Sequence, residues 1–174
     1  MRQQARIPRT SDKNALWRFA LAVYAEPGVK EECLYFQDRQ KGDVCLLLAA
    51  LFLASGGCSI GPDTLRRLKY SVPWQARLHL FLTRYVRKRL SRDGRTGRLR
   101  KALLKRELTM EQTRLARLEA ASIDERANLE QDDALRKLID SLCAFYGLKR
   151  IGLSATIAAT RKSGGSARHS PHLS

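Results

Sequence analysis

An unbroken run of eleven apolar residues, Val44–Ala54, constrains the fold of this chain more than any other feature. The run has no polar face, so a helix formed by it must be covered by other elements on all sides. Asp43 precedes the run as a helix N-cap, and Gly56 and Gly57 follow it as a helix stop. Because a membrane-spanning helix needs about 20 apolar residues, the run predicts a buried helix at the centre of a helical domain.

Apolar residues also recur at helical spacing on both sides of this run. The stripes are Leu16, Phe19, Ala20 and Val23; Val29, Cys33 and Phe36; Leu65 and Leu68; Trp74, Leu78, Phe81, Leu82 and Tyr85; Leu104, Leu108, Leu115 and Leu118; and Leu135, Leu138, Leu142 and Phe145. Pro27, Pro62, Pro73, Gly42 and Gly147 separate them. We therefore predict an all-α protein, a compact helical bundle of about five to seven helices around the central apolar helix.

Local signals predict two further helix boundaries. Thr109 and Gln112 have the spacing of a capping box, which predicts a break or a kink in the helix that carries the stripe ending at Leu118. Ser122 and Glu125 have the same spacing, which predicts the start of the last helix.

Composition divides the chain into three parts. Residues 1–10 are polar and basic, and we expect a disordered arm there. Residues 11–150 form a single helical domain in this interpretation. Residues 151–174 are rich in Ser, Gly, Ala and Arg, and we expect a disordered basic tail from about Ser154. The N-terminus shows no apolar signal segment, so we expect a cytoplasmic protein.

The formal net charge is +16, and most of it lies in one segment. Residues 62–106 hold 15 basic and 2 acidic side chains, and most of the basic ones are arginine. The arginine guanidinium can donate two parallel hydrogen bonds to phosphate oxygens, and it can also stack on bases. The segment therefore predicts a polyanion-binding surface. Its proposed members are Arg77, Arg84, Arg87, Lys88, Arg89, Arg92, Arg95, Arg98, Arg100, Lys101 and Lys105.

Two structural explanations compete with this prediction. A solvated face accounts for only part of the charge, since solubility needs a net charge of about 2–8. Pairing with the acidic last helix, which carries Glu130, Asp132, Asp133 and Asp140, would neutralise another part and leave most of the surface open.

Three kinds of partner suit such a surface. The first hypothesis is sequence-independent binding of RNA or DNA, bare or within a ribonucleoprotein, through phosphate contacts. The second is a protein–protein adaptor for an acidic protein, with a leucine stripe from Leu104 to Leu118 that is only partly covered. The third is peripheral binding to an anionic membrane, because Trp74, Phe81 and Tyr85 share a helix with many arginines.

No set of residues predicts catalysis, a metal site or a cofactor. Residues 57–61 match G-x-S-x-G, the nucleophile elbow of hydrolases, around Ser59. That motif needs a preceding strand, and here an apolar helix precedes it, so a glycine-rich connection between helices is the better interpretation. His169 and His172 lie in the tail without further ligands. We expect a non-enzymatic protein.

The turn that carries Gln37, Asp38, Gly42 and Asp43 is the most distinctive polar feature outside the basic segment. Its two carboxylates have the chemistry of a metal or acid–base site. The alternative is architectural, with Asp43 as cap of the central helix. No histidine or second acidic pair stands nearby in the sequence, so we favour the architectural role.

Four cysteines occur without a C-x-x-C pair: Cys33, Cys45, Cys58 and Cys143. Because three of them fall inside apolar helical patterns, we expect reduced structural thiols.

The residues from Leu16 to Leu53 also form a recognisable set. They read Leu16-Trp17, Phe19-Ala20, Tyr24-Ala25, Pro27-Gly28-Val29, Cys33-Leu34, Gln37-Asp38, Gly42-Asp43-Val44 and Leu46-Leu47-Leu48. This set resembles a family of short, uncharacterised proteobacterial proteins that is classified as a domain of unknown function. The resemblance continues more weakly to about Leu118, and family members commonly have Asn at the position of Cys45. It implies a bacterial, cytoplasmic, helical domain and no particular activity.

Overall fold

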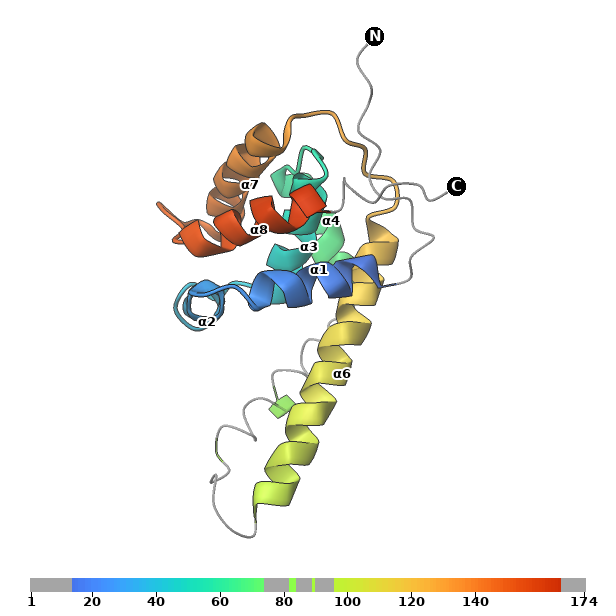
Figure 1. Cartoon of the computed structure of the whole chain (residues 1–174), viewed down its shortest axis with the longest axis vertical. Helices are drawn as coiled ribbons and strands as arrows, with labels where there is room; N and C mark the ends of the chain where they lie inside the picture. The colour runs from blue at the N-terminus through green and yellow to red at the C-terminus, as the bar shows by residue number, and fades with distance from the viewer. Residues whose placement is uncertain (1–13, 74–81, 84–88, 90–95, 167–174) are drawn as a thin grey trace.

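The computed structural model describes residues 14–73, 82–83, 89 and 96–166, and the described part of the chain is an all-α bundle (Figure 1). Its helices are α1 (Ala15–Tyr24), α2 (Val29–Arg39), α3 (Val44–Ser55), α4 (Pro62–Ser71), α6 (Gly97–Ala121), α7 (Gln131–Tyr146) and α8 (Ser154–Ser166). The predicted fold class is therefore confirmed. Figure 1 shows that the first half of α6 extends beyond the compact body formed by the other labelled helices.

The predicted central helix is α3. All its residues are buried except Phe52 and Ser55, which are half-buried. It contacts α1, α2, α4, α6, α7 and α8. Because a fully buried leucine stabilises the fold by roughly 1.5–3 kcal/mol relative to an exposed one, the apolar run supplies the centre of the core.

A strap from the α6–α7 connection closes the C-terminal end of α3. The Gly57 carbonyl accepts hydrogen bonds from the backbone N–H groups of Asn128 and Leu129, both at 3.0 Å. Gly57 has a φ of +84°, and a Cβ there would lie 2.4 Å from the Leu129 carbonyl oxygen. The Asn128 side chain accepts from the Ser59 N–H at 3.2 Å. The G-x-S-x-G segment is thus a connection between helices, as predicted, and anchors this strap.

Both predicted capping boxes are wrong. Helix α6 runs through Thr109 without a break. The Thr109 hydroxyl does not cap a new helix but donates to the Lys105 carbonyl at 3.1 Å within α6. Ser122 ends α6 and donates from its hydroxyl to the Glu119 carbonyl at 2.7 Å. The next helix begins only at Gln131. At Thr109 the helix simply continues, and at Ser122 the residues form the C-terminal turn of α6 instead of the start of the next helix.

The expected disorder from Ser154 onward is wrong as far as Ser166, because this segment forms α8. The Glu32 carboxylate on α2 accepts the N–H groups of Ala155 and Thr156, both at 2.9 Å. It also accepts the hydroxyls of Ser154 at 3.0 Å and Thr156 at 2.8 Å. These bonds satisfy the exposed N–H groups at the start of α8, as an N-cap does.

Helix α8 then packs on α1, α2 and α3 and buries Thr156, Ala159 and Thr160. The helical domain therefore extends beyond residue 150, where the composition had ended it. The expected arm at residues 1–10 and the end of the tail, residues 167–174, lie outside the described residues.

Candidate functional site

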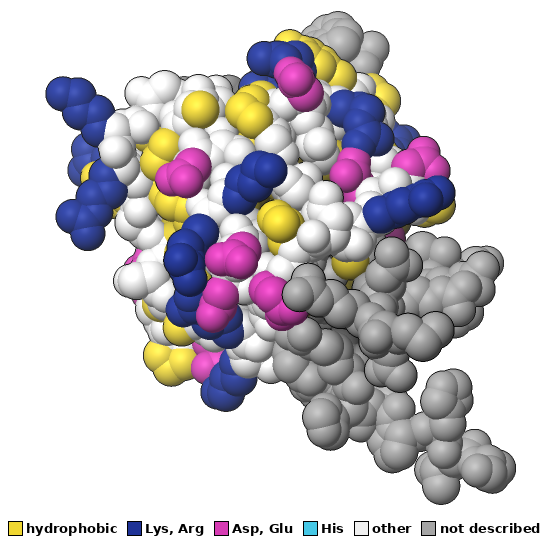
Figure 2. Space-filling model, turned by 90° about the horizontal axis from the view of Figure 1, so that it is seen from above, with side chains coloured by type: hydrophobic (Ala, Val, Ile, Leu, Met, Phe, Trp, Pro, Cys, Tyr) yellow, Lys and Arg dark blue, Asp and Glu magenta, His cyan; other side chains and the backbone are white. Residues whose placement is uncertain are grey.

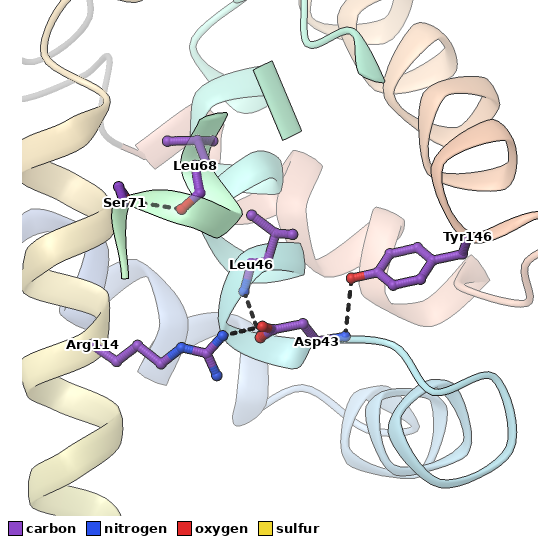
Figure 3. Close-up of polar contacts among 6 residues, drawn as sticks. All are labelled: Asp43, Leu46, Leu68, Ser71, Arg114 and Tyr146. Carbon is purple, nitrogen blue, oxygen red and sulfur yellow. Dashed lines mark hydrogen bonds and ion pairs between the residues drawn. The ribbon is translucent and has the colours of Figure 1, made fainter. Parts of the chain in front are cut away.

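The turn before α3 is the centre of a buried polar network that joins three helices (Figure 3). Asp43 caps α3 by accepting the Leu46 N–H at 3.1 Å. Its other carboxylate oxygen pairs with the Arg114 guanidinium from α6, and the Asp43 N–H donates to the Tyr146 hydroxyl from α7 at 3.2 Å. The side chains of Asp43 and Arg114 are only 15% and 9% exposed. The ion pair is therefore largely removed from water.

Burial and charge shift the pKa values in this network. Burial lowers the pKa of Arg114, but the Asp43 carboxylate more than offsets it, so the pKa lies above its ordinary value. Cys45, itself buried, lies within electrostatic range of this guanidinium. Burial, helped by the Asp43 charge, raises the pKa of Tyr146 to about 12. Arg114 and Tyr146 thus keep fixed protonation states near neutral pH, which suits a structural role.

The other residues of the predicted turn have structural contacts. A Cβ on Gly42 would lie 2.2 Å from the Phe36 ring, so only glycine lets the chain pass there. The Gln37 amide donates to the Asp38 carboxylate at 3.4 Å, and the Lys41 ammonium donates to the Asp38 carbonyl at 3.1 Å. Asp43 pairs with Arg114 and caps α3. The architectural interpretation accounts for these contacts.

The remaining sequence candidates do not assemble a reactive centre within the described residues. No group of three or more His, Cys, Asp or Glu side chains there could hold a metal ion. Cys33, Cys45 and Cys58 are buried free thiols, and Cys143 is a half-buried one. Burial raises the pKa of Cys33 and Cys58 to about 11, so these thiols are poor nucleophiles. All three histidines lie outside the described part.

The described part of the predicted polyanion surface lies on residues 97–106, which we name the basic half of α6. This segment carries Arg98, Arg100, Lys101, Lys105 and Arg106 and no acidic residue. All five are exposed except Arg100, which is half-buried. At 3.6 residues per turn, Arg98, Lys101 and Lys105 share one outward face. Arg100 points to another face.

The rest of the predicted surface is mostly outside the described residues. These residues are Arg77, Arg84, Arg87, Lys88, Arg92 and Arg95. Arg89 is described and exposed.

The cations of the basic half of α6 make no ion pair with any other described residue. Two of the acids expected to neutralise the basic segment pair elsewhere, because Asp132 binds Arg161 at 2.8 Å and Asp133 faces Arg136 at 3.9 Å. Figure 2 looks onto the opposite end of the molecule, where Lys and Arg are interleaved with Asp and Glu. The density of unpaired positive charge on the basic half of α6 therefore contrasts with that mixed surface.

Leucine side chains accompany these cations. Leu115 and Leu118 are buried in the bundle, whereas Leu104 and Leu108 are 55% and 51% exposed. The predicted stripe is thus only partly covered, as expected. Trp74, Phe81 and Tyr85, on which the membrane hypothesis depends, lie outside the described residues. No helix in the described part is both long and apolar enough to cross a bilayer.

Two structurally important side chains, Arg114 and Glu32, were not predicted. Arg114 lies beside Leu115 and one helical turn before Leu118, so its place on the apolar face was a usable signal for a buried cation. Glu32 has no such signal, because its partners lie more than 120 residues away in the sequence.

Comparison with known protein families gives a match over the first four described helices and most of α6. Residues 15–118, more than half of the chain, match the family described as Protein of unknown function (DUF2390). No curated protein and no solved structure matches the chain. The match contains the residues that carry the predicted resemblance to an uncharacterised family, ends within α6, and leaves α7 and α8 outside. The chain therefore belongs to the DUF2390 family of proteins of unknown function.

Proposed function

We propose that this is a non-enzymatic cytoplasmic protein that contacts RNA or DNA, bare or in a ribonucleoprotein, through the basic half of α6. The observation that carries the proposal is the clustered charge: ten consecutive residues of a projecting helix segment hold five cations and no carboxylate, and none of the five forms an ion pair with another described residue. Such a segment attracts polyanions and gains affinity by releasing their counterions.

The spacing of the outward cations fits a row of phosphates. Arg98 and Lys105 lie about 10 Å apart along the helix axis, with Lys101 between them. Measured along the axis of a double helix, that length corresponds to about three phosphates of one strand. Arginine and lysine contacts of this kind position a strand without reading its bases. The expected binding is therefore independent of sequence and sensitive to salt.

The test is a titration of fluorescently labelled single-stranded RNA with the full chain at low salt. The triple variant Arg98→Gln/Lys101→Gln/Lys105→Gln, named the α6 variant, should bind at least roughly tenfold more weakly than the wild type, since three exposed charge contacts are lost. A matched control, Lys30→Gln/Arg126→Gln/Lys137→Gln, removes the same charges from other exposed positions. Equal binding by the α6 variant and the control, or wild-type binding weaker than about 10 μM, would refute the proposal.

The exposed leucines favour a second candidate, an adaptor that binds an acidic protein. Leu104 and Leu108 border the face of Lys101 and Lys105, so an acidic amphipathic helix could meet both. In that case a partner would co-purify with the native protein after nuclease treatment. Leu104→Ser/Leu108→Ser would then abolish capture, whereas this variant should bind RNA as the wild type does.

A further inference from the structure

We propose that the nucleic acid held by α6 is double-stranded DNA, and that the basic half of α6 lies in its major groove. The inference rests on the proposed function and deepens it, because it selects one class of nucleic acid. Two observations carry it: exposed cations occur on both edges of one face of α6, and that face bears no exposed carboxylate.

The exposed cations of this face lie in two rows along the helix. The first cation row comprises Arg98, Lys101 and Lys105, and the second cation row comprises Arg106 and Arg117. At about 100° per residue, the mean directions of the two rows differ by about 120° around the helix axis. Neither row forms an ion pair with another described residue. All five charges are therefore available to a ligand.

The surface between the two rows is low and carries no charge. Ala102 lies about 40° from both Arg98 and Arg106 around the helix axis. Thr109 and Thr113 follow it toward the bundle, and all three are exposed. Each threonine hydroxyl donates to the carbonyl four residues earlier, at 3.1 and 2.9 Å. A ligand can thus approach the helix backbone closely and meets no free hydroxyl donor there.

The carboxylates of α6 lie away from this face. Glu107 is buried, and Glu111 and Glu119 are half-buried. The Glu119 side chain accepts the Ala15 N–H at 3.1 Å, so it is engaged at the contact with α1. Phosphates that approach the exposed face therefore meet cations on both edges without a neighbouring exposed carboxylate of α6 to repel them.

Cations on both edges suit a ligand that flanks the helix on two sides. A single strand would follow one cation row while the other row pointed away from it. In a duplex the two phosphate strands form the walls of a groove, so each row can contact one strand. A straight helix crosses the winding groove at an angle and meets the two strands at different points along its length. The second row begins after the first one ends, at Lys105, and so has the required stagger.

The size of the helix fits the major groove of B-form DNA. An α-helix with its side chains is about 10–12 Å across, and this groove is about 12 Å wide. The basic half of α6 is about 15 Å long, which corresponds to about four base pairs along the duplex axis. Figure 1 shows that this segment extends beyond the other labelled helices. The major groove of an RNA duplex is deep and narrow, so the same helix fits it poorly.

The experiment measures the binding of the full chain to three labelled ligands of one sequence at the same low salt. They are a DNA duplex, an RNA duplex and a single DNA strand, each about 16 nucleotides long. The wild type should bind the DNA duplex at least roughly threefold more tightly than the RNA duplex, which is also a double-stranded polyanion but lacks the wide groove.

A variant of the second cation row tests the geometry. Arg106→Gln/Arg117→Gln should bind the DNA duplex roughly three- to tenfold more weakly than the wild type, and the single strand within about twofold of it. The control Arg39→Gln/Arg150→Gln removes two exposed arginines from other parts of the surface and should stay within about twofold of the wild type on both ligands. Thermal melting checks that each variant is folded.

Three results would overturn the inference. The first is an RNA duplex that binds as tightly as the DNA duplex. The second is a second-row variant that matches its control on the DNA duplex, and the third is an equal loss on the duplex and the single strand. Failure of the proposed function gives a different result, in which the α6 variant binds all three ligands as its own matched control does.

Discussion

Asp43 shows how one residue connects segments that are distant in the sequence. Its carboxylate caps α3 and pairs with Arg114, and its N–H donates to Tyr146. The Nε atom of Arg114 is buried and makes no hydrogen bond with the described residues. The guanidinium therefore depends on Asp43 to offset the cost of its burial.

Replacing Asp43 should destabilise the protein strongly. In Asp43→Ala, α3 loses its cap and Arg114 becomes a buried charge without its carboxylate, so we expect a loss of about 3–5 kcal/mol. Arg114→Met should cost less, because Asp43 keeps its bond to the Leu46 N–H and some exposure to water. The double variant should lose clearly less than the sum of the single losses. Urea unfolding measures all three values, and additive losses would contradict this account.

At the scale of elements, the described helices differ in how well the sequence predicts them. The bounds of α3 were predicted nearly to the residue. An apolar run that begins after a capping Asp43 and ends at Gly56 is expected to form a single buried helix. Helix α8 was missed because its stability comes from Glu32 and from packing on α1, α2 and α3. Its own composition, rich in Ser, Gly and Ala, resembles that of a disordered tail. Tertiary contacts therefore override local preference there.

The cap of α8 predicts a pH dependence of stability. Desolvation raises the pKa of Glu32, but the hydrogen bonds from Ala155, Thr156 and Ser154 outweigh it, so the pKa lies below the ordinary value of 4.5. A lowered folded-state pKa means that this stabilisation is complete above about pH 4.5 and is lost as the pH falls through the folded-state value.

The comparison of wild type with Glu32→Gln isolates this effect, because the other carboxylates are common to both proteins. The wild type should be more stable by roughly 1 kcal/mol at neutral pH, and the difference should shrink as the pH drops below 4.5. Thermal melting across that range measures it. A constant difference at all pH values would show that the charge of Glu32 does not support α8.

At the scale of the whole molecule, the folded domain extends further along the chain than the region that matches the family. The match ends at residue 118, yet α7 and α8, which follow that residue, both pack against α3. Leu135, Leu138 and Leu142 of α7 belong to the same core as the apolar run. The core is therefore incomplete without the segment that follows the matched region.

A chain that ends at residue 118 should consequently fail to fold cooperatively, whereas one that ends at residue 166 should fold as the full chain does. Far-UV circular dichroism during urea unfolding distinguishes them, and binding of an apolar dye would report the uncovered α3. A cooperative transition in the shorter chain, with a slope like that of the full chain, would contradict this view of the core.

The candidate site was predictable in its chemistry but not in its shape. The excess of arginine and lysine marked the segment that contains the basic half of α6, and Asp43 caps α3 as the sequence predicts. Glu32 escaped notice because the groups that it binds at the start of α8 lie more than 120 residues away in the sequence.

The salt dependence of RNA binding tests the central claim most directly. The logarithm of the affinity of the full chain for single-stranded RNA should fall linearly with the logarithm of the salt concentration, with a slope of about −0.7 per phosphate contact. The α6 variant removes three such contacts, so its slope should be shallower by about 2. The matched control should keep the wild-type slope. An α6 variant with an unchanged slope would contradict the claim that these cations contact phosphates.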